Sequence, residues 1–399
     1  MSGRRKYQGS RRRLTSVIVA VAMIGGALAA CSNTSDDRSS ATPRSRPSDL
    51  APQVAIPTPT VAVAAPGPHW FCLPRPPRTA ADYRQALNHH DERWQGGDGG
   101  QPLTLPDGRI VWIFGDTTFG EIQSDGALVP GRWGLAHGSM LIQEGPCFDP
   151  FYGADAERPR DLVPSPGPGE LYWPGGGWVG PDGSELLVVL NRIKVKAGAK
   201  ADGFGFIPNG TAVARFRLPD LALIRVEQLP RPPVKGLAGW FGQPVHVGSW
   251  VYLYASDDRT QYVARMPDDT TRWSSSRRWQ YWTGRRWSSS RSAMAPMVVE
   301  DPPWAGVAVS VYRSEFRAIA KTQEGFSKDV GAWAAPTPAG PWTALGTVAD
   351  ASTKGRSLSY AAHAATNIAG TEPLLVWSVS ARGANSTRGS GISVQPMPD

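Results

Sequence analysis

Short runs of hydrophobic residues dominate the chain from about Trp70 to its end. The runs are rich in Val, Tyr, Trp and Leu, and they are separated at short intervals by Pro, Asp and Gly. Long stretches with the 3.6-residue period of an amphipathic helix are scarce. This pattern is typical of strands joined by tight turns, and it predicts an all-β fold.

Five segments of this part resemble one another in outline. In the first two, a Pro-Asp-Gly turn precedes an apolar strand that ends in a short polar residue. Starts spaced by about 50 to 75 residues leave room for four strands per unit, which is the signature of a β-propeller. We therefore predict a five-bladed propeller over residues 69–399, with a β-sandwich or a two-domain β protein as the alternative. The segments are Gly99–Asp116, Pro174–Asn191, Gln243–Ser256, Ala295–Ser314 and Ala361–Ser380.

A different pattern precedes the propeller. Leu14–Ala30 is a run of mostly small apolar residues after a basic segment, as in a secretory signal peptide. Its end, Leu28-Ala29-Ala30-Cys31, resembles the box at which bacterial lipoproteins are cleaved and lipidated on the cysteine. We predict a lipoprotein signal at 1–30 and a disordered tether rich in Ser, Pro and Ala at 31–68. An ordinary signal peptide with a chance cysteine is the alternative.

Composition and charge narrow the classes of function. The 399 residues include 44 Gly and 37 Pro, too many for long helical bundles. The formal net charge is +8, but six of the 42 basic residues lie in the signal, which leaves 36 basic against 34 acidic residues. A nearly neutral body gives no electrostatic footprint for nucleic acid. The six are Arg4, Arg5, Lys6, Arg11, Arg12 and Arg13.

Beyond Cys31 the chain has two cysteines, Cys72 and Cys147. In an exported protein we expect them to form a disulfide, and two buried free thiols are the alternative. The sequence contains no CxxC motif, no Cys/His cluster and no phosphate-binding loop. We therefore expect no metal ion and no cofactor.

The first hairpin brings two acids together. If Pro106–Gly108 forms a three-residue loop that ends in a left-handed glycine, Leu105 faces Arg109, and counting back along both strands sets Asp98 opposite Asp116. Opposed residues have Cβ atoms about 4.5–5.5 Å apart, so one of two such acids tends to keep its proton, as an acid paired with a base or nucleophile requires. A two-residue turn would instead place the acids on opposite faces. Each Asp alone is also an ordinary loop residue or turn cap.

The second hairpin, counted in the same way, sets Trp173 opposite Asn191. It therefore carries an aromatic ring and an amide where the first hairpin carries two acids. If both hairpins are blades, all four residues open onto the same end of the central funnel. Acids for chemistry, an indole for stacking and an amide for hydroxyl groups suit a sugar.

Three stretches of the first unit resemble a family of secreted five-bladed propellers, common in actinobacteria, that includes endo-D-arabinanases acting on mycobacterial cell-wall arabinan. They are Trp94-Gln-Gly-Gly-Asp98-Gly-Gly, the Leu-Pro-Asp-Gly turn and Trp112-Ile-Phe-Gly-Asp116-Thr117. The resemblance is clear over about residues 90–145 and looser over 279–284. It implies that Asp98 and Asp116 take part in glycosidic cleavage. Where a polar stretch facing the substrate is expected after Gly-Asp-Thr, this sequence offers mainly His137.

Further residues are candidates for substrate binding, although each is also compatible with a structural role. These candidates are His137, Glu170, Tyr172, Trp173, Asn191 and His363. Trp240 and Tyr254 are assigned to the core. Trp and Arg alternate over 271–291, which can indicate a surface for single-stranded nucleic acid. The export signal and the neutral body instead favour an exposed hairpin or a flap that faces a glycan.

The sequence as a whole predicts a surface-anchored glycoside hydrolase. Its substrate would be a furanose-containing polysaccharide of the envelope, similar to D-arabinan, and its contact with the membrane would be made through the lipid on Cys31 alone. A propeller that binds glycans or acts as a scaffold without catalysis is the alternative. A third possibility is an interaction module within an envelope complex.

Overall fold

The computed structural model describes most of the chain after the predicted tether. The described residues are 70–123, 128–153, 159–196, 205–257, 259–269, 273–303, 306–353, 357–381 and 391–398. The predicted signal at 1–30, Cys31 and the tether at 31–68 lie outside these residues, so their roles stay predictions. In the described part, no helix is both long enough and apolar enough to cross a membrane.

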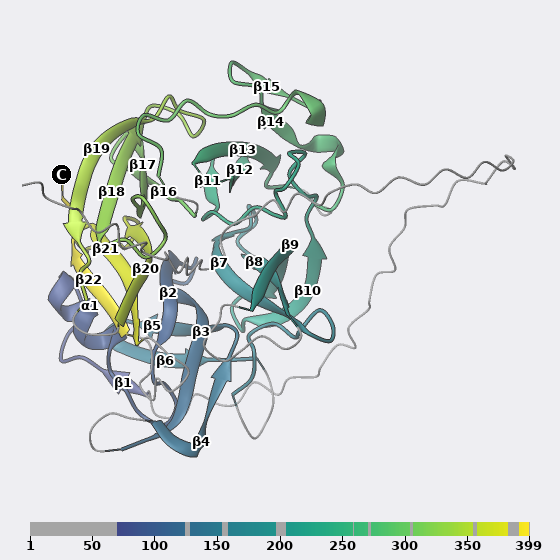
Figure 1. The fold of residues 1–399 in the computed structure, drawn as a ribbon. Coiled ribbons are helices and arrows are strands. Elements are labelled where there is room, and N and C mark those ends of the chain that lie inside the picture. Colours follow the sequence, from purple (N-terminus) through teal and green to yellow (C-terminus); the bar gives the residue numbers. More distant parts are fainter. Residues whose placement is uncertain are drawn as a thin grey trace, which may run out of the picture.

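Five sheets stand around a central axis as the blades of a propeller (Figure 1). The innermost strands, in blade order, are β2 (Gly97–Thr104), β7 (Glu170–Val179), β11 (Val245–Val247), β16 (Ala308–Tyr312) and β20 (Ser357–Ala365). Strand β2 contacts both β7 and β20, and β16 contacts both β11 and β20, as expected for strands that line one axis. The predicted all-β, five-bladed propeller is confirmed, and a β-sandwich is excluded.

Blade one contains six of the described strands. Outward from β2 they are β3 (Ile110–Ile122), β5 (Ser139–Glu144), β6 (Cys147–Phe151) and β1 (Phe71–Cys72), while β4 (Leu128–Ala136) pairs with the far end of β3. Cys72 faces Cys147 where β1 pairs with β6, and the predicted disulfide joins them. The first described strand is therefore fixed to the outer edge of this blade.

The other four blades follow in chain order, each containing one of the predicted units. Blade two adds β8 (Glu185–Val195), β9 (Phe206–Arg217) and β10 (Ala222–Gln228). Blade three adds β12 (Trp250–Asp257), β13 (Thr260–Pro267), β14 (Gln280–Trp282) and β15 (Trp287–Ser288), with short 3₁₀ turns η1 (Ser276–Arg278) and η2 (Arg291–Ala293). Blade four adds β17 (Glu315–Lys321), β18 (Asp329–Ala335) and β19 (Thr343–Asp350). Blade five adds β21 (Leu374–Ala381) and β22 (Gly391–Pro396).

A helix takes the place of a fourth strand in blade five. Helix α1 (Ala80–Leu87) begins at Thr79, whose hydroxyl accepts from the backbone of Asp82 while the Asp82 carboxylate accepts from the backbone of Thr79. Just after the helix, Asn88 pairs with β22 as a strand would. Its Nδ2 donates to the carbonyl of Ile392 at 2.7 Å, and the amide of Ile392 donates to its Oδ1 at 2.9 Å.

The hydrophobic core consists of layers between neighbouring blades. Val111 and Ile113 of blade one, for example, pack in one cluster with Val188 and Leu190 of blade two. Side chains from both faces of a blade are therefore buried, which explains why many strands read as continuous apolar runs. Large aromatic residues fill these layers, and the following tryptophans are fully buried: Trp94, Trp112, Trp178, Trp240, Trp273 and Trp279.

Candidate functional site

The turn of the first hairpin has the predicted form. The Leu105 amide donates to the Arg109 carbonyl at 2.8 Å, and the Gly108 amide donates to the Leu105 carbonyl at 3.0 Å. Gly108 has a φ of 88°, in the left-handed region that glycine enters without strain. Pro106–Gly108 is thus a three-residue loop, and Leu105 faces Arg109 as predicted.

Two bulges then alter the pairing near the candidate acids. The predicted register holds over Gln101–Thr104. Beyond it β2 carries one extra residue at Gly100, and β3 carries one extra residue further on, so that Asp98 lies opposite both Gly115 and Asp116. The predicted one-to-one pairing of the two acids is therefore replaced by one acid facing a two-residue bulge, a device that often re-aims side chains near active sites.

The bulges have a local cause in the Gly-Gly-Asp-Gly-Gly stretch. Gly99 and Gly100 have φ values of 93° and 83°, which residues with a Cβ rarely adopt. A Cβ at Gly100 would also lie 2.9 Å from the ring of Phe114. A straight register fails here because these glycines allow the backbone to turn where other residues would keep it extended.

Asp116 is held by two nitrogen donors from other strands. Its Oδ1 accepts from Nε1 of Trp173, on the inner strand of blade two, at 2.6 Å. Nδ1 of His137, just after β4, lies 2.8 Å from the same oxygen. Because a carboxylate only accepts, that nitrogen carries the proton. Asp116 remains 25% exposed, which leaves it accessible to a bound molecule.

The charge of Asp116 affects the pKa of His137. Burial of the imidazole would by itself lower this pKa, but the hydrogen bond from His137 to Asp116 and the negative charges of Asp116 and Asp161 outweigh burial and raise it. Asp161 also accepts from the backbone amide of His137 at 2.7 Å. Protonated His137 and ionised Asp116 therefore stabilise one another.

Asp98 is held from the opposite side of the blade-one hairpin. The hydroxyl of Tyr360, on the inner strand of blade five, donates to Oδ1 of Asp98 at 2.6 Å. A bulge in β20 follows Tyr360, and Ala361 has a φ of 52°, a conformation that is strained for a residue with a Cβ. The inner strand of blade five therefore bends next to Tyr360, the residue that contacts Asp98.

His363 lies inside the protein, behind this bend. Its side chain is 1% exposed, with Nδ1 3.0 Å from the carbonyl of Ala361 and Nε2 3.1 Å from the carbonyl of Gly100. Burial lowers its pKa, although both carbonyls oppose that change. The structure thus places this candidate between blades one and five, where its ring links two bulged strands.

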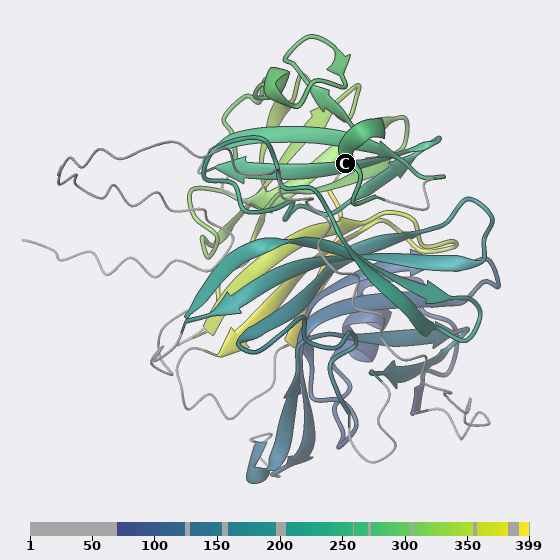
Figure 2. The ribbon, with the colours of Figure 1, turned by 90° about the vertical axis from the view of Figure 1, so that its right-hand side faces the viewer.

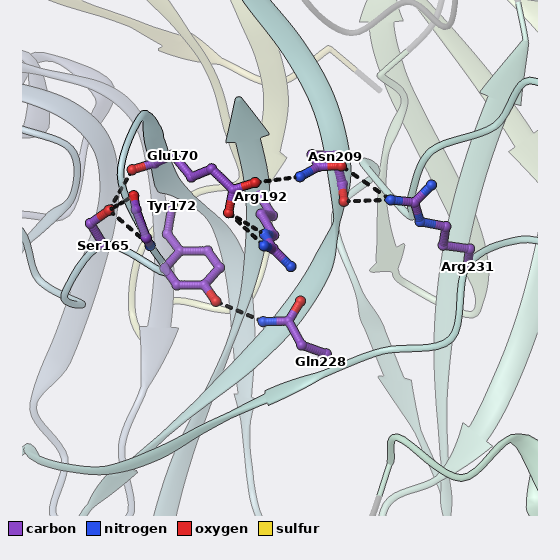
Figure 3. A network of polar contacts seen from close by, with 8 residues as sticks. Ser165, Glu170, Tyr172, Arg192, Asn209, Gln228 and Arg231 are labelled. Carbon is purple, nitrogen blue, oxygen red and sulfur yellow. Dashed lines mark hydrogen bonds and ion pairs between the residues drawn. The ribbon is translucent and has the colours of Figure 1, made fainter. Parts of the chain in front are cut away.

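Glu170 belongs to a polar network in blade two (Figure 3). Its Oε2 accepts from Nε and Nη2 of Arg192 at 2.9 and 2.5 Å, and its Oε1 accepts from Nδ2 of Asn209 at 2.6 Å. Arg231 in turn donates to the side chain and backbone of Asn209, both at 3.1 Å. A carboxylate with both oxygens engaged suits a supporting role, in which Glu170 fixes the start of β7 just before Trp173.

The remaining candidates of blade two are mostly buried. Trp173 lies opposite Asn191 as predicted, and its indole meets the ring of Phe206 edge-on at a centroid distance of 4.8 Å. Asn191 is 7% exposed. Tyr172 is 5% exposed, and its hydroxyl accepts from Nε2 of Gln228 at 2.7 Å (Figure 3). In this structure Trp173 contacts Asp116 by donating a hydrogen bond from its indole Nε1.

The comparison that decides the family spans most of the propeller. Residues 81–387 match a family described as a domain of unknown function (DUF5005). The chain belongs to the DUF5005 family. No curated protein matches this DUF5005 chain.

Solved structures share the fold of the DUF5005 chain at low sequence identity. A Bacteroides ovatus protein, provisionally described as a hydrolase, is 16% identical with a TM-score of 0.57 and covers 79% of this chain and 89% of its own. A family 43 glycoside hydrolase from Xanthomonas citri, complexed with xylotriose, is 11% identical with a TM-score of 0.45 over 80% and 93% of the two chains. The first likeness shows a common fold.

The DUF5005 domain has no group of three or more His, Cys, Asp or Glu side chains arranged to hold a metal ion among its described residues. The predicted absence of a metal or cofactor stays a prediction. Four buried amide oxygens lack hydrogen-bond partners within the described part, namely Oε1 of Gln101, Oδ1 of Asn191, Oε1 of Gln243 and Oε1 of Gln261. Gly176 lies beside the first of them and has a φ of 112°, a conformation that favours glycine.

Sequence reasoning missed Tyr360 as a partner of Asp98. In the sequence, Tyr360 stands three positions before His363, and nothing there connects it with Asp98. It follows each of the two acids by more than 200 positions. The available signal was the propeller itself, because the first and fifth blades of such a ring are neighbours. Within the DUF5005 chain, inner-strand residues of blades one, two and five therefore belong together.

Proposed function

We propose that the protein is a glycoside hydrolase that cleaves a furanose-containing polysaccharide of the cell envelope, similar to D-arabinan. The observation that most supports this is the convergence of an indole N–H and an imidazole N–H on one oxygen of Asp116. A second carboxylate, Asp98, lies across the bulge from it. Two acids in different surroundings are the groups that glycosidic cleavage requires. The sequence resemblance to endo-D-arabinanases supports the choice of substrate.

The two acids are suited to different roles. Two N–H donors stabilise the ionised form of Asp116, so we assign it the role that needs a carboxylate, either base or nucleophile. Both donors bind Oδ1, which leaves Oδ2 to face water or the anomeric carbon. Asp98 is then the proton donor, and the phenol of Tyr360 fixes its position.

The same bonds are broken and formed overall whether Asp116 acts as a base or as a nucleophile. The glycosidic C–O bond breaks as Asp98 delivers its proton to the leaving oxygen. The oxygen of a water molecule ends on the anomeric carbon. Either the water attacks directly and Asp116 takes its proton, or the water hydrolyses a sugar ester formed on Asp116 and its proton returns to Asp98. His137 keeps its Nδ1 proton throughout and donates it to Oδ1 of Asp116.

The proposal includes a location outside the cytoplasmic membrane. The predicted signal at 1–30 would direct export, and a lipid on Cys31 would anchor the propeller through the tether at 31–68. This location would bring the site to envelope polysaccharides. It would also provide the oxidising conditions that favour the disulfide between Cys72 and Cys147.

The test measures new reducing ends released from mycobacterial arabinogalactan by purified residues 67–399. Asp98→Asn and Asp116→Asn should each lower release by at least about a hundredfold, the usual contribution of a general acid or base. Asp182→Asn is the matched control, because Asp182 occupies the second Pro-Asp-Gly turn away from the site, and it should leave release unchanged. Binding without release, unaffected by either site variant, would instead show a non-catalytic glycan-binding propeller.

A further inference from the structure

An extension of blade one projects beyond its sheet (Figure 1, Figure 2). It consists of the far end of β3 paired with β4, with Thr117 opposite Ala136 and Gly120 opposite Trp133. We call residues 116–122 and 128–137 the arm. The arm is supported from one side, because the Thr118 amide donates to the carbonyl of Gly96 at 3.0 Å near its base, and the Gly120 amide donates to the carbonyl of Glu92 at 2.7 Å further along.

One face of the arm begins at the candidate acid. The pairing of Thr117 with Ala136, extended by one position, sets Asp116 opposite His137, and their side chains are in contact. Since side chains alternate along strands, the next positions on this face are those of Thr118 with Leu135 and of Gly120 with Trp133. From base to tip, this face of the arm carries Asp116, His137, Thr118, Leu135, Gly120 and Trp133.

The other face of the arm has partners of its own. Thr117 and Ala136 are fully buried. The ring of Phe119 covers Gly134, where a Cβ would lie only 2.4 Å from it, and meets Tyr152 edge-on. Near the base this face packs against the protein, whereas the side chains of Glu121 and Arg132 further along it are exposed. The face that carries Asp116 is therefore the one turned outward at the base.

The outward face is unusually apolar for a surface. Leu135 is 43% exposed and Trp133 is 46% exposed, the highest exposure of any tryptophan in the described residues. The position opposite Trp133 is a glycine with a φ of 113°, so no cross-strand side chain covers the indole. Most other tryptophans in the described residues fill the layers between blades, so a half-exposed one on the face that begins at Asp116 is a candidate for ligand binding.

We propose that this face is a glycan-binding platform that holds the polysaccharide beyond the sugars bordering the cleaved bond. The inference rests on the proposed function. The C–H face of a sugar ring packs against an indole while its hydroxyl groups stay in water, which fits a ring that is half exposed. At the usual rise of a strand, Gly120 lies about 13 Å from Asp116 along β3, so Trp133 would contact sugars further along the same chain.

Continuity favours a polysaccharide over other occupants. The platform and the Asp116–His137 pair are adjacent positions of one sheet face, so a chain bound at the carboxylate would pass over Leu135 and Trp133. An anionic membrane would need a basic cluster. The arginine described on the arm, Arg132, lies on the other face and is paired with Glu121 at 2.9 Å.

Retardation in native gels tests the platform without any need for catalysis. Wild-type protein, Trp133→Ala, Trp133→Tyr and Leu345→Ala are run in gels containing mycobacterial arabinogalactan, arabinan or no polysaccharide. Loss of one aromatic stacking contact should weaken retardation by about three- to tenfold in Trp133→Ala, while Trp133→Tyr keeps most of it. Leu345 is the matched control because it is 46% exposed on β19 of blade four, away from the arm.

Hydrolysis adds a second measurement. In Trp133→Ala, kcat/KM for the polysaccharide relative to a disaccharide fragment should fall by the same factor, because only the longer chain reaches the platform. An unchanged ratio together with unchanged retardation overturns the platform while leaving the hydrolase proposal intact. If no reducing ends form but retardation depends on Trp133, the platform stands and the hydrolase proposal fails. Binding of the wild type to phosphatidylglycerol vesicles through Trp133, or no retardation in any gel, overturns the platform.

Discussion

At the scale of single residues, the site is a set of hydrogen bonds that join three blades. Asp116 bonds to Trp173 of blade two, and Asp98 bonds to Tyr360 of blade five. The sequence could predict the two acids, because hairpin counting and a family resemblance both select them. It could not predict Tyr360, because only the closed ring brings that residue to the first blade.

His137 provides a test of the electrostatics at this scale. In the folded protein its pKa is raised, so the pair with Asp116 contributes stability that is fully present below the ordinary histidine pKa of about 6.5 and is lost as pH rises through the raised value. In Asp116→Asn, burial should dominate and the pKa of His137 should fall. NMR titration of the imidazole in both proteins measures this shift.

The control for that titration is His90, whose pKa is lowered mainly by burial and secondarily by the charge of His89. It should titrate identically in the wild type and in Asp116→Asn. A pKa of His137 that is the same in both proteins would contradict the described pair.

At the scale of elements, the sequence predicted the turn of the first hairpin correctly, but neither the turn of the second hairpin nor the pairing along whole strands. The loop at Pro106–Gly108 follows from residue types with fixed turn preferences. The bulges at Gly100 and beside Asp98 do not, because glycine permits a bulge without requiring one. In the second hairpin the loop has four residues where three were predicted, because Gly180 faces Glu185, and a bulge between Pro174 and Gly177 then restores the predicted facing of Trp173 and Asn191.

The fourth unit shows the same limit. Among the described residues of the stretch Ala295–Ser314, only Ala308–Tyr312 is a β-strand, and Val299 forms an isolated bridge with Trp342. The apolar residues before Asp301 read as a strand, yet they border two prolines, Pro302 and Pro303, that cannot donate to a ladder. Hydrophobicity alone therefore overestimates strand content at blade connections.

Asn88 offers a test at this scale, since its side chain replaces a strand for blade five. Asn88→Ala should lower the free energy of unfolding by about 1–3 kcal/mol, because it leaves the amide and carbonyl of Ile392 without their partner. Urea unfolding measures the change. Gln85→Ala, on the exposed face of the same helix, is the matched control and should change stability little. Equal stabilities of the two variants would show that helix packing alone covers β22.

At the scale of the whole molecule, the number of blades was the most predictable feature. Each blade must bury both faces against its neighbours, so the same pattern of apolar strands and turns occurs five times in the sequence. This repetition made the number of blades predictable. The extra strand pair of blade one and the helix of blade five break that repeat. Neither feature could be predicted from the repeat itself. The arm, formed by β4 and the far end of β3 in blade one, carries the proposed platform.

The proposed anchor is also a property of the whole chain. Growth of cells with a labelled fatty acid should label the full-length protein, and Cys31→Ala should abolish that label because the acceptor thiol is lost. Cys72→Ala serves as the matched control and should keep it, since Cys72 is held in the disulfide with Cys147. Persistent labelling of Cys31→Ala would refute lipidation at this residue.

The pairing of Asn88 with β22 has a consequence for biosynthesis. The helix that covers blade five is synthesised well before the strand it covers, because Asn88 and Ile392 are 304 residues apart. During translation, four blades can form before the edge that meets the helix exists. The ring is therefore completed only once β22 is available, and a chain that stops before residue 391 would present an open strand edge on blade five to other proteins.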